Sequence, residues 1–308
     1  MPDAPRPLTG YGNQAPDIRW PNGARVAVNF VLNYEEGSEY TFGDGDGKSD
    51  AALTEVAQAR VPPSLRDLAA ESMFEFGTRV GFWRLYRLFQ DRGLPLTVFA
   101  SALALERAPD AAAAIAKTNW DIVCHGWRWI EHYLLDEATE REHIARAHAS
   151  ILRMVGRPAE GWYCRYGPSP ATRRLVVEHG GFSYDSDAYN DELPYWQTVA
   201  GKGHLVVPYS LATNDAKLVG GSLVTGRAFG EFLIDSFNVL ASEAHLHPRM
   251  MSVGMHTRVL GQPGRIVGLM AFLDHLACRE DVWVCRRADL AAHWRAQVPY
   301  DVAGVGAG

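Results

Sequence analysis

Short apolar runs alternate with amphipathic helical patterns along most of the chain. The short runs are rich in β-branched and aromatic residues and predict strands at 25–32, 96–100, 121–124, 161–164, 182–184, 205–207, 251–255 and 282–285. Apolar positions spaced about one helical turn apart predict helices over 71–91, 102–117, 137–155, 171–179, 227–243, 265–278 and from about 287. This alternation is typical of a parallel sheet covered by helices, so the sequence predicts an α/β fold.

The number of strand–helix units predicts how the sheet is arranged. Seven or eight units without a nucleotide-binding glycine fingerprint favour a (β/α) barrel over an open, doubly wound sheet. Residues 1–308 contain no internal repeat or low-complexity linker, so we expect a single catalytic domain. We expect an N-terminal arm over about 1–23 and a long loop over about 37–70, and loops of that length in compact domains are usually functional.

Composition narrows the class of protein. The 308 residues carry a net charge of −6, which argues against a nucleic-acid binder because such proteins need a basic face. No apolar run is long enough to span a membrane, and the N-terminus lacks the apolar core of a signal peptide. The four cysteines form no C-x-x-C pair, which argues against a zinc ribbon. Four cysteines in 308 residues are more typical of reduced thiols in a cytoplasmic enzyme than of a disulfide framework.

Polar side chains follow several predicted strands directly. In β/α barrels such positions meet at one mouth, where active sites lie. The side chains are Glu35, Glu36, His125, Arg165, Asp185, Asp187, His256 and Arg258. Two adjacent carboxylates can share a proton so that one acts as a base, and histidines at two separate strand ends favour a functional site. Structural interpretations stay open, since Arg165 could pair with an acid inside the mouth and an aspartate could cap the next segment.

The acidic run from Asp44 to Asp50 has the spacing of a weak calcium-loop match. Ser49 occupies the position at which such a loop requires glycine, so calcium binding is disfavoured.

The residues after the strands resemble the motifs of the polysaccharide-deacetylase (NodB-homology) superfamily. The matching positions are Asn33-Tyr-Glu-Glu-Gly37 for its acidic motif, His125 for the first histidine of H-x-x-x-H, Arg165 for the third motif, Asp187 with Trp196 for the fourth and His256 for the fifth. The resemblance implies a deformed (β/α) barrel.

The departures from these motifs concern the metal that the superfamily binds. Trp129 stands where the second histidine would be, and Glu36 replaces the metal-binding aspartate. Two of the three expected ligands are therefore altered, and His132 could substitute only if its loop folded back. The resemblance thus implies a site with no metal and no other cofactor.

One branch of the superfamily, the deacetylase-like allantoinases, is similar over about residues 8–296. The similar segments include Leu8–Gly12, Asn33–Gly37, Glu71–Leu85, Pro95–Phe99, His125–Trp129 and Tyr184–Asp187. The resemblance implies hydrolysis of the hydantoin ring of allantoin to allantoate by a homo-oligomer, with allantoin as the small-molecule partner.

That resemblance suggests a role for each candidate residue. Glu35 is the first candidate for the base, and Glu36, His125 and His256 are placed to orient water or move protons. The expected substrate contacts are Arg165, Arg258, Asp187, Trp127, Trp129 and Trp196. Three alternatives stay open: a metal-dependent cyclic-imide or cyclic-amide hydrolase, an N-deacetylase on the same scaffold, and a non-catalytic binding protein.

Overall fold

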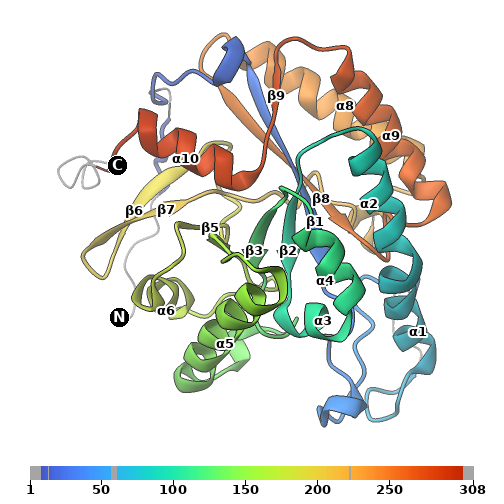
Figure 1. The fold of residues 1–308 in the computed structure, drawn as a ribbon. Helices are drawn as coiled ribbons and strands as arrows, with labels where there is room; N and C mark the ends of the chain where they lie inside the picture. Colours follow the sequence, from blue (N-terminus) through green and yellow to red (C-terminus); the bar gives the residue numbers. More distant parts are fainter. Residues whose placement is uncertain (1–7, 13, 57–60, 222, 301–308) are drawn as a thin grey trace.

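The computed structural model describes residues 8–12, 14–56, 61–221 and 223–300. In this part of the chain, nine strands form one sheet in the order β6-β7-β5-β4-β3-β2-β1-β8, and β9 also pairs with β1. The strands are β1 (Val26–Tyr34), β2 (Thr97–Ala100), β3 (Asp121–Cys124), β4 (Gly161–Trp162), β5 (Tyr184–Asp185), β6 (Tyr195–Val199), β7 (Lys202–Val206), β8 (Arg249–His256) and β9 (Val282–Val284). Figure 1 shows β1, β2, β3 and β8 near the centre of the molecule and the β6–β7 hairpin at its left side.

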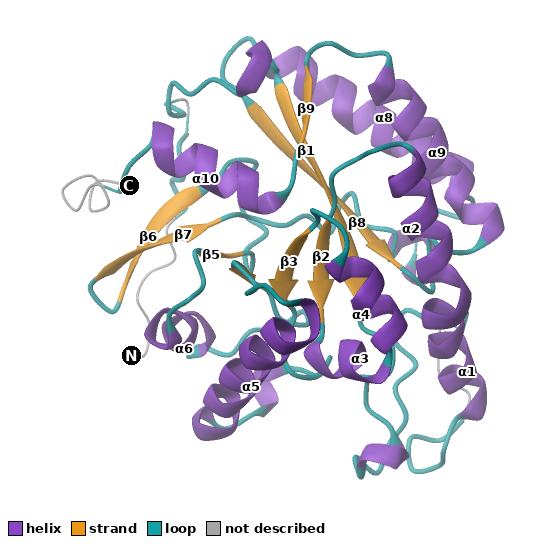
Figure 2. Cartoon of the chain, viewed as in Figure 1, coloured by secondary structure: helices purple, strands orange, loops and turns teal. Residues whose placement is uncertain are grey.

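Helices surround these strands on the outside (Figure 2). The α-helices are α1 (Leu68–Phe76), α2 (Phe82–Asp91), α3 (Ala102–Arg107), α4 (Pro109–Ala116), α5 (Glu137–Val155), α6 (Thr172–His179), α7 (Lys217–Gly220), α8 (Gly226–Glu243), α9 (Pro263–Ala277) and α10 (Arg287–Gln297). Three short 3₁₀ turns in the described residues are η1 (Pro21–Gly23), η2 (Phe42–Asp44) and η4 (His132–Leu134). The element η3 (Gly77–Gly81) is a π-helical turn.

The predicted α/β barrel class is confirmed, and the barrel is deformed because it stays open. The sheet ends at β6 on one side and at β8 on the other, its parallel part ends at β7, and a single parallel bridge between Asn214 and Gly254 links the segment after β7 to β8. The pairs along the path are parallel except for the β6–β7 hairpin. The sequence did not predict this hairpin, since one of its two turn residues, Ala200, has a positive φ of 49° without being Gly, Asn or Asp.

Two predicted helices are each divided in the structure. The helix predicted over 102–117 breaks at Ala108, because Pro109 cannot donate a backbone hydrogen bond and instead starts α4. The helix predicted over 71–91 contains the π-helical turn η3, whose glycines lie against the mouth of the barrel. By contrast, α5 matches its prediction, since Asp136 caps its first turn and Gly156 ends it in the left-handed conformation.

Strand register decides which side chains meet at the mouth. All nine residues of β1 are buried, and Asn33 of β1 lies opposite Phe99 of β2 and His256 of β8. At the next level, Tyr34 lies opposite Ala100, which in turn lies opposite Cys124. The residues that follow β1 and β3 therefore emerge beside the last residue of β8.

Within the described residues, no helix combines the length and the apolar character that a membrane span requires.

Candidate active site

Glu35 lies at the centre of a buried cluster at the mouth of the barrel. Its Oε1 is 3.2 Å from Nε2 of His125 and 3.5 Å from Nε2 of His256, and its Oε2 is 2.8 Å from a terminal nitrogen of Arg258. Burial alone would raise the pKa of Glu35, but the charges of His256 and Arg258 and the hydrogen bond from His125 hold it well below its usual range. Glu35 is therefore a carboxylate at neutral pH.

His125 has both ring nitrogens engaged. Its Nδ1 lies 3.1 Å from the carbonyl oxygen of Tyr163, and its Nε2 lies 3.2 Å from Oε1 of Glu35. The ring is thereby fixed with Nε2 directed at Glu35.

Arg258 balances the two adjacent carboxylates. Its terminal nitrogens contact Glu35 at 2.8 Å and Glu36 at 3.0 Å, and its guanidinium lies 4.5 Å from the ring centre of Phe74 and 4.9 Å from that of Trp129. Burial would lower the pKa of Arg258, but the two carboxylates outweigh it and raise that pKa. A permanent cation therefore lies beside both acids and is held by two aromatic faces.

The carboxylate of Glu36 is fully engaged by protein groups. Its Oε1 accepts hydrogen bonds from the Thr257 hydroxyl and from Arg258, and its Oε2 accepts from the backbone N–H of Glu35 at 3.2 Å. By contrast, Oε2 of Glu35 accepts no aligned hydrogen bond, although the nearby Arg258 nitrogen provides charge. Glu35 is thus held by fewer aligned donors than Glu36.

His256 is oriented and charged by Asp215. The carboxylate of Asp215 accepts from Nδ1 of His256 at 2.6 Å and from the backbone N–H groups of His256 at 2.7 Å and Leu260 at 3.1 Å. Burial disfavours the charged ring, but Glu35 and Asp215 outweigh it and raise the pKa of His256 to about 9. His256 is therefore a protonated imidazolium at neutral pH.

The π-helical turn η3 closes one side of the cluster. A Cβ atom at Gly77 would lie 2.5 Å from Oε1 of Glu36, and one at Gly81 would lie 2.0 Å from the carbonyl oxygen of Thr257. Real Cβ atoms do not come so close, so glycine at these positions lets the helix backbone pass directly over the acids. Single π-helical turns are frequent at functional sites, and here the turn accompanies this close passage.

The metal that the superfamily uses does not fit these residues. Both oxygens of Glu36 already have partners, the guanidinium of Arg258 lies against it, and Trp129 offers no ligand atom. His132 does not replace the missing ligand, because its Nδ1 lies 3.0 Å from Glu140 of α5. Within the described residues, no group of three or more His, Cys, Asp or Glu side chains could hold a metal ion.

Arg165 lies at the edge of the cluster and has acidic partners. Its guanidinium is 3.8 Å from the ring centre of Trp129, on which it stacks, and it pairs with Asp50 and, at 3.3 Å, with Glu131. The structure thus brings Arg165 and Trp129 to the site, with Trp129 lying between Arg165 and Arg258.

Three other predicted residues have their recorded contacts with other parts of the chain. Trp127 is in the core with Arg146 of α5 over its ring at 3.6 Å, and Trp196 donates to the carbonyl of Val298 at 2.6 Å. Asp187 accepts from the backbone N–H of Cys164 at 3.0 Å, and its Oδ2 has no partner. Burial raises the pKa of Asp187 to about 7, with the charge of Asp185 as a further cause. Within the described residues, no hydrogen bond or ion pair joins these three to Glu35, and their substrate contacts stay predictions.

Sequence reasoning missed Asp215 and Thr257 as parts of the site. Thr257 directly follows His256, so the strand-end pattern itself was the signal that could have found it. Asp215 follows no strand: it lies after the irregular segment that bridges from β7 to β8, beside the Asn214–Gly254 bridge. Only the three-dimensional pairing places it next to His256.

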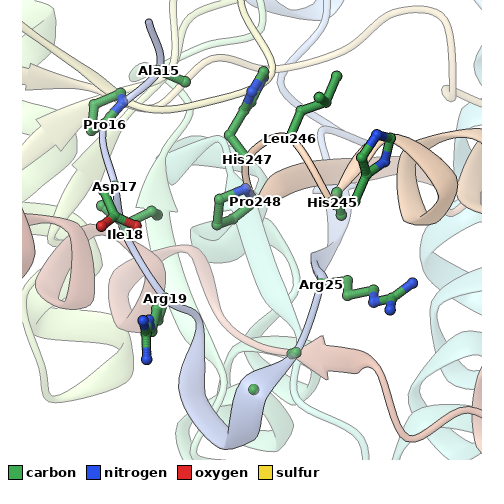
Figure 3. A pocket seen from close by; sticks show the side chains of 13 residues that line it. Ala15, Pro16, Asp17, Ile18, Arg19, Arg25, His245, Leu246, His247 and Pro248 are labelled. Carbon is green, nitrogen blue, oxygen red and sulfur yellow. The ribbon is translucent and has the colours of Figure 1, made fainter.

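A separate hollow of about 440 Å³ lies between the N-terminal arm and the segment before β8 (Figure 3). Its lining includes Arg19, Arg25, His245 and His247, but Arg19 and Arg25 extend in different directions from separate parts of the rim. Because its cations do not converge, we do not assign a site to this hollow.

Comparison with known proteins agrees with the barrel fold. The family model described as polysaccharide deacetylase matches residues 67–184. A protein of Schizosaccharomyces pombe (strain 972 / ATCC 24843) that carries the name of this family is 35% identical over 315 residues, covering 96% of this chain and 98% of its own length. The chain belongs to the polysaccharide deacetylase family. Its barrel is thus the fold of a hydrolase family, which supports the prediction that this protein is an enzyme.

Two solved structures are similar along nearly the whole chain. One is a Pseudomonas aeruginosa PAO1 protein named for the same family, at 43% identity and a TM-score of 0.93, covering 97% of this chain and 100% of that one. The other is PuuE allantoinase, at 44% identity and a TM-score of 0.93 over the same shares of the two chains. The resemblance to the superfamily and to its allantoinase branch is therefore confirmed.

Proposed function

We propose that this protein hydrolyses the hydantoin ring of allantoin to allantoate without a metal. The observation that carries the proposal is the position of Arg258, whose guanidinium lies against the acidic pair while Trp129 replaces the missing ligand. The full-length similarity to PuuE allantoinase supports the choice of substrate.

Glu35 is the proposed base. Water attack on a cyclic amide requires a group that takes the water proton as the new carbon–oxygen bond forms. Glu35 is ionised, and its Oε2 has no aligned hydrogen-bond donor. His125 holds the opposite oxygen, which keeps the orientation of the carboxylate fixed.

His256 is the proposed acid. When the ring carbon–nitrogen bond breaks, the leaving nitrogen has to gain a proton, and a protonated imidazolium can supply it. The pKa of about 9 keeps the proton on His256 at neutral pH, and Asp215 stabilises that charged form. The proton then returns from Glu35 to His256, since the two groups are 3.5 Å apart.

Arg258 is proposed to stabilise the negative charge that develops on the carbonyl oxygen. A fixed cation in a buried site acts on that charge without first reorganising water. Trp129 and Phe74 hold the guanidinium in place. Arg165 is proposed to hold a ring carbonyl or the ureido tail, and Asp187 is proposed as a further polar contact.

A substrate panel tests the proposal. Purified protein is assayed on allantoin, hydantoin, succinimide and an N-acetylated sugar, each with and without a chelator. We expect allantoin to react fastest, because its ureido tail gives an arginine an additional group to bind, and we expect chelation to leave that rate unchanged.

The remaining results separate the alternatives. Turnover of succinimide alone, lost on chelation and restored by zinc, would identify a metal-dependent cyclic-imide hydrolase. Release of acetate from the sugar would identify an N-deacetylase. No turnover of any compound, with binding of allantoin intact, would identify a binding protein.

A further inference from the structure

The catalytic cluster is closed off from solvent. The exposed fractions of Glu35, His125 and His256 are 1%, 1% and 5%. A ring of the size of a hydantoin cannot contact Glu35 in this arrangement, so a part of the structure has to move before the reaction.

Residues 38–56, here called the strap, extend from the acidic pair across the mouth. The carbonyl of Ser38 accepts from the backbone N–H of Trp129 at 3.1 Å, and the carbonyl of Leu53 accepts from Nε of Arg258 at 3.1 Å. Within the strap, the backbone N–H of Asp50 donates to the carbonyl of Tyr40 at 2.9 Å. The strap thus forms a closed loop of its own that contacts two members of the site.

Three aspartates fasten the strap to the barrel. Asp44 accepts from Arg107 at 2.9 Å, and Asp46 accepts from Arg128 at 2.6 and 2.8 Å. The third, Asp50, pairs with Arg165. The three arginines belong to the end of α3 and to the loops that follow β3 and β4. We call these three pairs the clasp.

The clasp is suited to opening. The Arg107–Asp44 pair has an exposed guanidinium, and exposed pairs contribute little stability and are screened by salt. The Arg128–Asp46 and Arg165–Asp50 pairs are more buried and hold the strap more firmly. The strap also has exposed glycines at 43, 45 and 47, and Gly45 and Gly47 have positive φ angles of 82° and 64°. Local opening takes place in regions with few buried apolar contacts, and the centre of the strap meets that description.

We propose that the strap lifts to admit the substrate and that the clasp holds it shut between turnovers. Opening releases Asp50 from Arg165, which frees that guanidinium for the substrate. Opening also withdraws the Leu53 carbonyl from Nε of Arg258, so the position of the strap changes the surroundings of the cation that is proposed to act in catalysis. The inference rests on the proposed function only in requiring that a small molecule reach Glu35.

Amide hydrogen exchange of the full chain tests this proposal without substrate. Exchange of peptides from 41–52 is measured by mass spectrometry in wild type and in the triple variant Asp44→Asn/Asp46→Asn/Asp50→Asn. The matched control is Asp274→Asn, which removes a pair with Arg92 away from the strap. We expect strap amides to exchange at least about 10-fold faster in the triple variant, with peptides of β1 unchanged.

Salt and substrate provide the second readout. Raising NaCl from 0.02 to 0.5 M should accelerate strap exchange in wild type and have less effect in the triple variant, which has already lost the three clasp carboxylates. Strap amides that exchange as slowly as those of β1 in every protein, or that accelerate equally in Asp274→Asn, would overturn the proposal. Clasp-dependent exchange in a protein that does not hydrolyse allantoin would instead reject the proposed substrate and leave the strap supported.

Discussion

Arg258 and Arg287 are both buried, yet they lie in regions with opposite electrostatics. Arg258, at the mouth, contacts the carboxylates of Glu35 and Glu36. Arg287, the first residue of α10, lies inside the barrel and donates to Asn29 at 2.8 Å and Ser252 at 2.8 Å. It also donates to Ser186 and to the carbonyls of Val207 and Pro208. No carboxylate accepts a hydrogen bond from Arg287 within the described part of the chain.

The pKa values of the two side chains reflect these surroundings. Burial lowers the pKa of both guanidinium groups, and at Arg258 the two carboxylates reverse the effect and raise it. At Arg287 burial prevails, and its pKa is lowered. Charges that balance one another can redistribute protons during a reaction, whereas neutral dipoles around one cation only hold it in place. The comparison therefore predicts that changes at the mouth affect catalysis and that changes around Arg287 affect stability.

The largest expected effect comes from removing the central acid of the mouth. Glu35→Gln keeps the size of the side chain and removes the base, so kcat should fall by about 10²–10⁴. Circular dichroism should show an unchanged fold. Near-normal kcat would move the role of base to Glu36 or show that neither acid has it.

Removing the buried Arg287 side chain should reduce stability and leave catalysis nearly unchanged. Arg287→Met leaves several buried acceptors without a donor, at about 1–3 kcal/mol each, so the free energy of unfolding should fall by about 3 kcal/mol or more. Urea unfolding measures that loss, and kcat per folded molecule should stay near wild type. Arg287→Lys, which keeps the charge, should recover part of the stability. A large loss of kcat with unchanged stability would contradict the comparison.

The charge on His256 makes stability depend on pH. Its pKa is about 9 in the folded protein and about 6.5 when unfolded, so folding favours the protonated ring. This contribution is fully present below pH 6.5 and is lost as pH rises through 9, a change of about 3 kcal/mol. Urea unfolding from pH 6 to 10 should show the decline. Asp215→Asn should lower the pKa of His256, and therefore reduce the decline and move the alkaline limb of the pH–rate profile to lower pH.

The smallest effect should come from the helix that passes over the acids. In Gly77→Ala the added methyl group would meet Glu36, so the helix or the carboxylate has to shift. We expect a loss of stability of about 1–3 kcal/mol, the usual cost of overpacking, and a decrease in kcat/KM. Gly264→Ala is the control, because nothing lies within 4 Å of the added atom there. Equal effects of the two substitutions would show that helix propensity, and not contact with Glu36, is the cause.

The sequence predicted the features that depend on local patterns, namely the strands and the residues at their ends. The apolar runs located β1, β3 and β8, and the residues after them gave Glu35, His125, His256 and Arg258. The structure brings these four residues together because the ends of parallel strands meet at one edge whatever the details of the loops.

Contacts between distant segments were not predictable in this way. Asp215 reaches His256 only because the barrel stays open and an irregular segment crosses the gap. The π-helical turn depends on glycines whose significance appears only when Glu36 is placed beneath them. In the sequence, Arg287 is an ordinary residue at the start of a helix. Its burial depends on how α10 packs against the barrel.

The passage of the helix over the acids also bears on stereochemistry. Because not even a methyl group fits between Gly77 and Glu36, no water molecule can approach the acids from the helix side. A planar amide bound at this site would then be open to attack on one of its two faces only. For a chiral ring, the mirror-image molecules cannot offer the same face and place their substituents identically. One-sided access therefore leads to discrimination between enantiomers, even without a contact to the chiral centre itself.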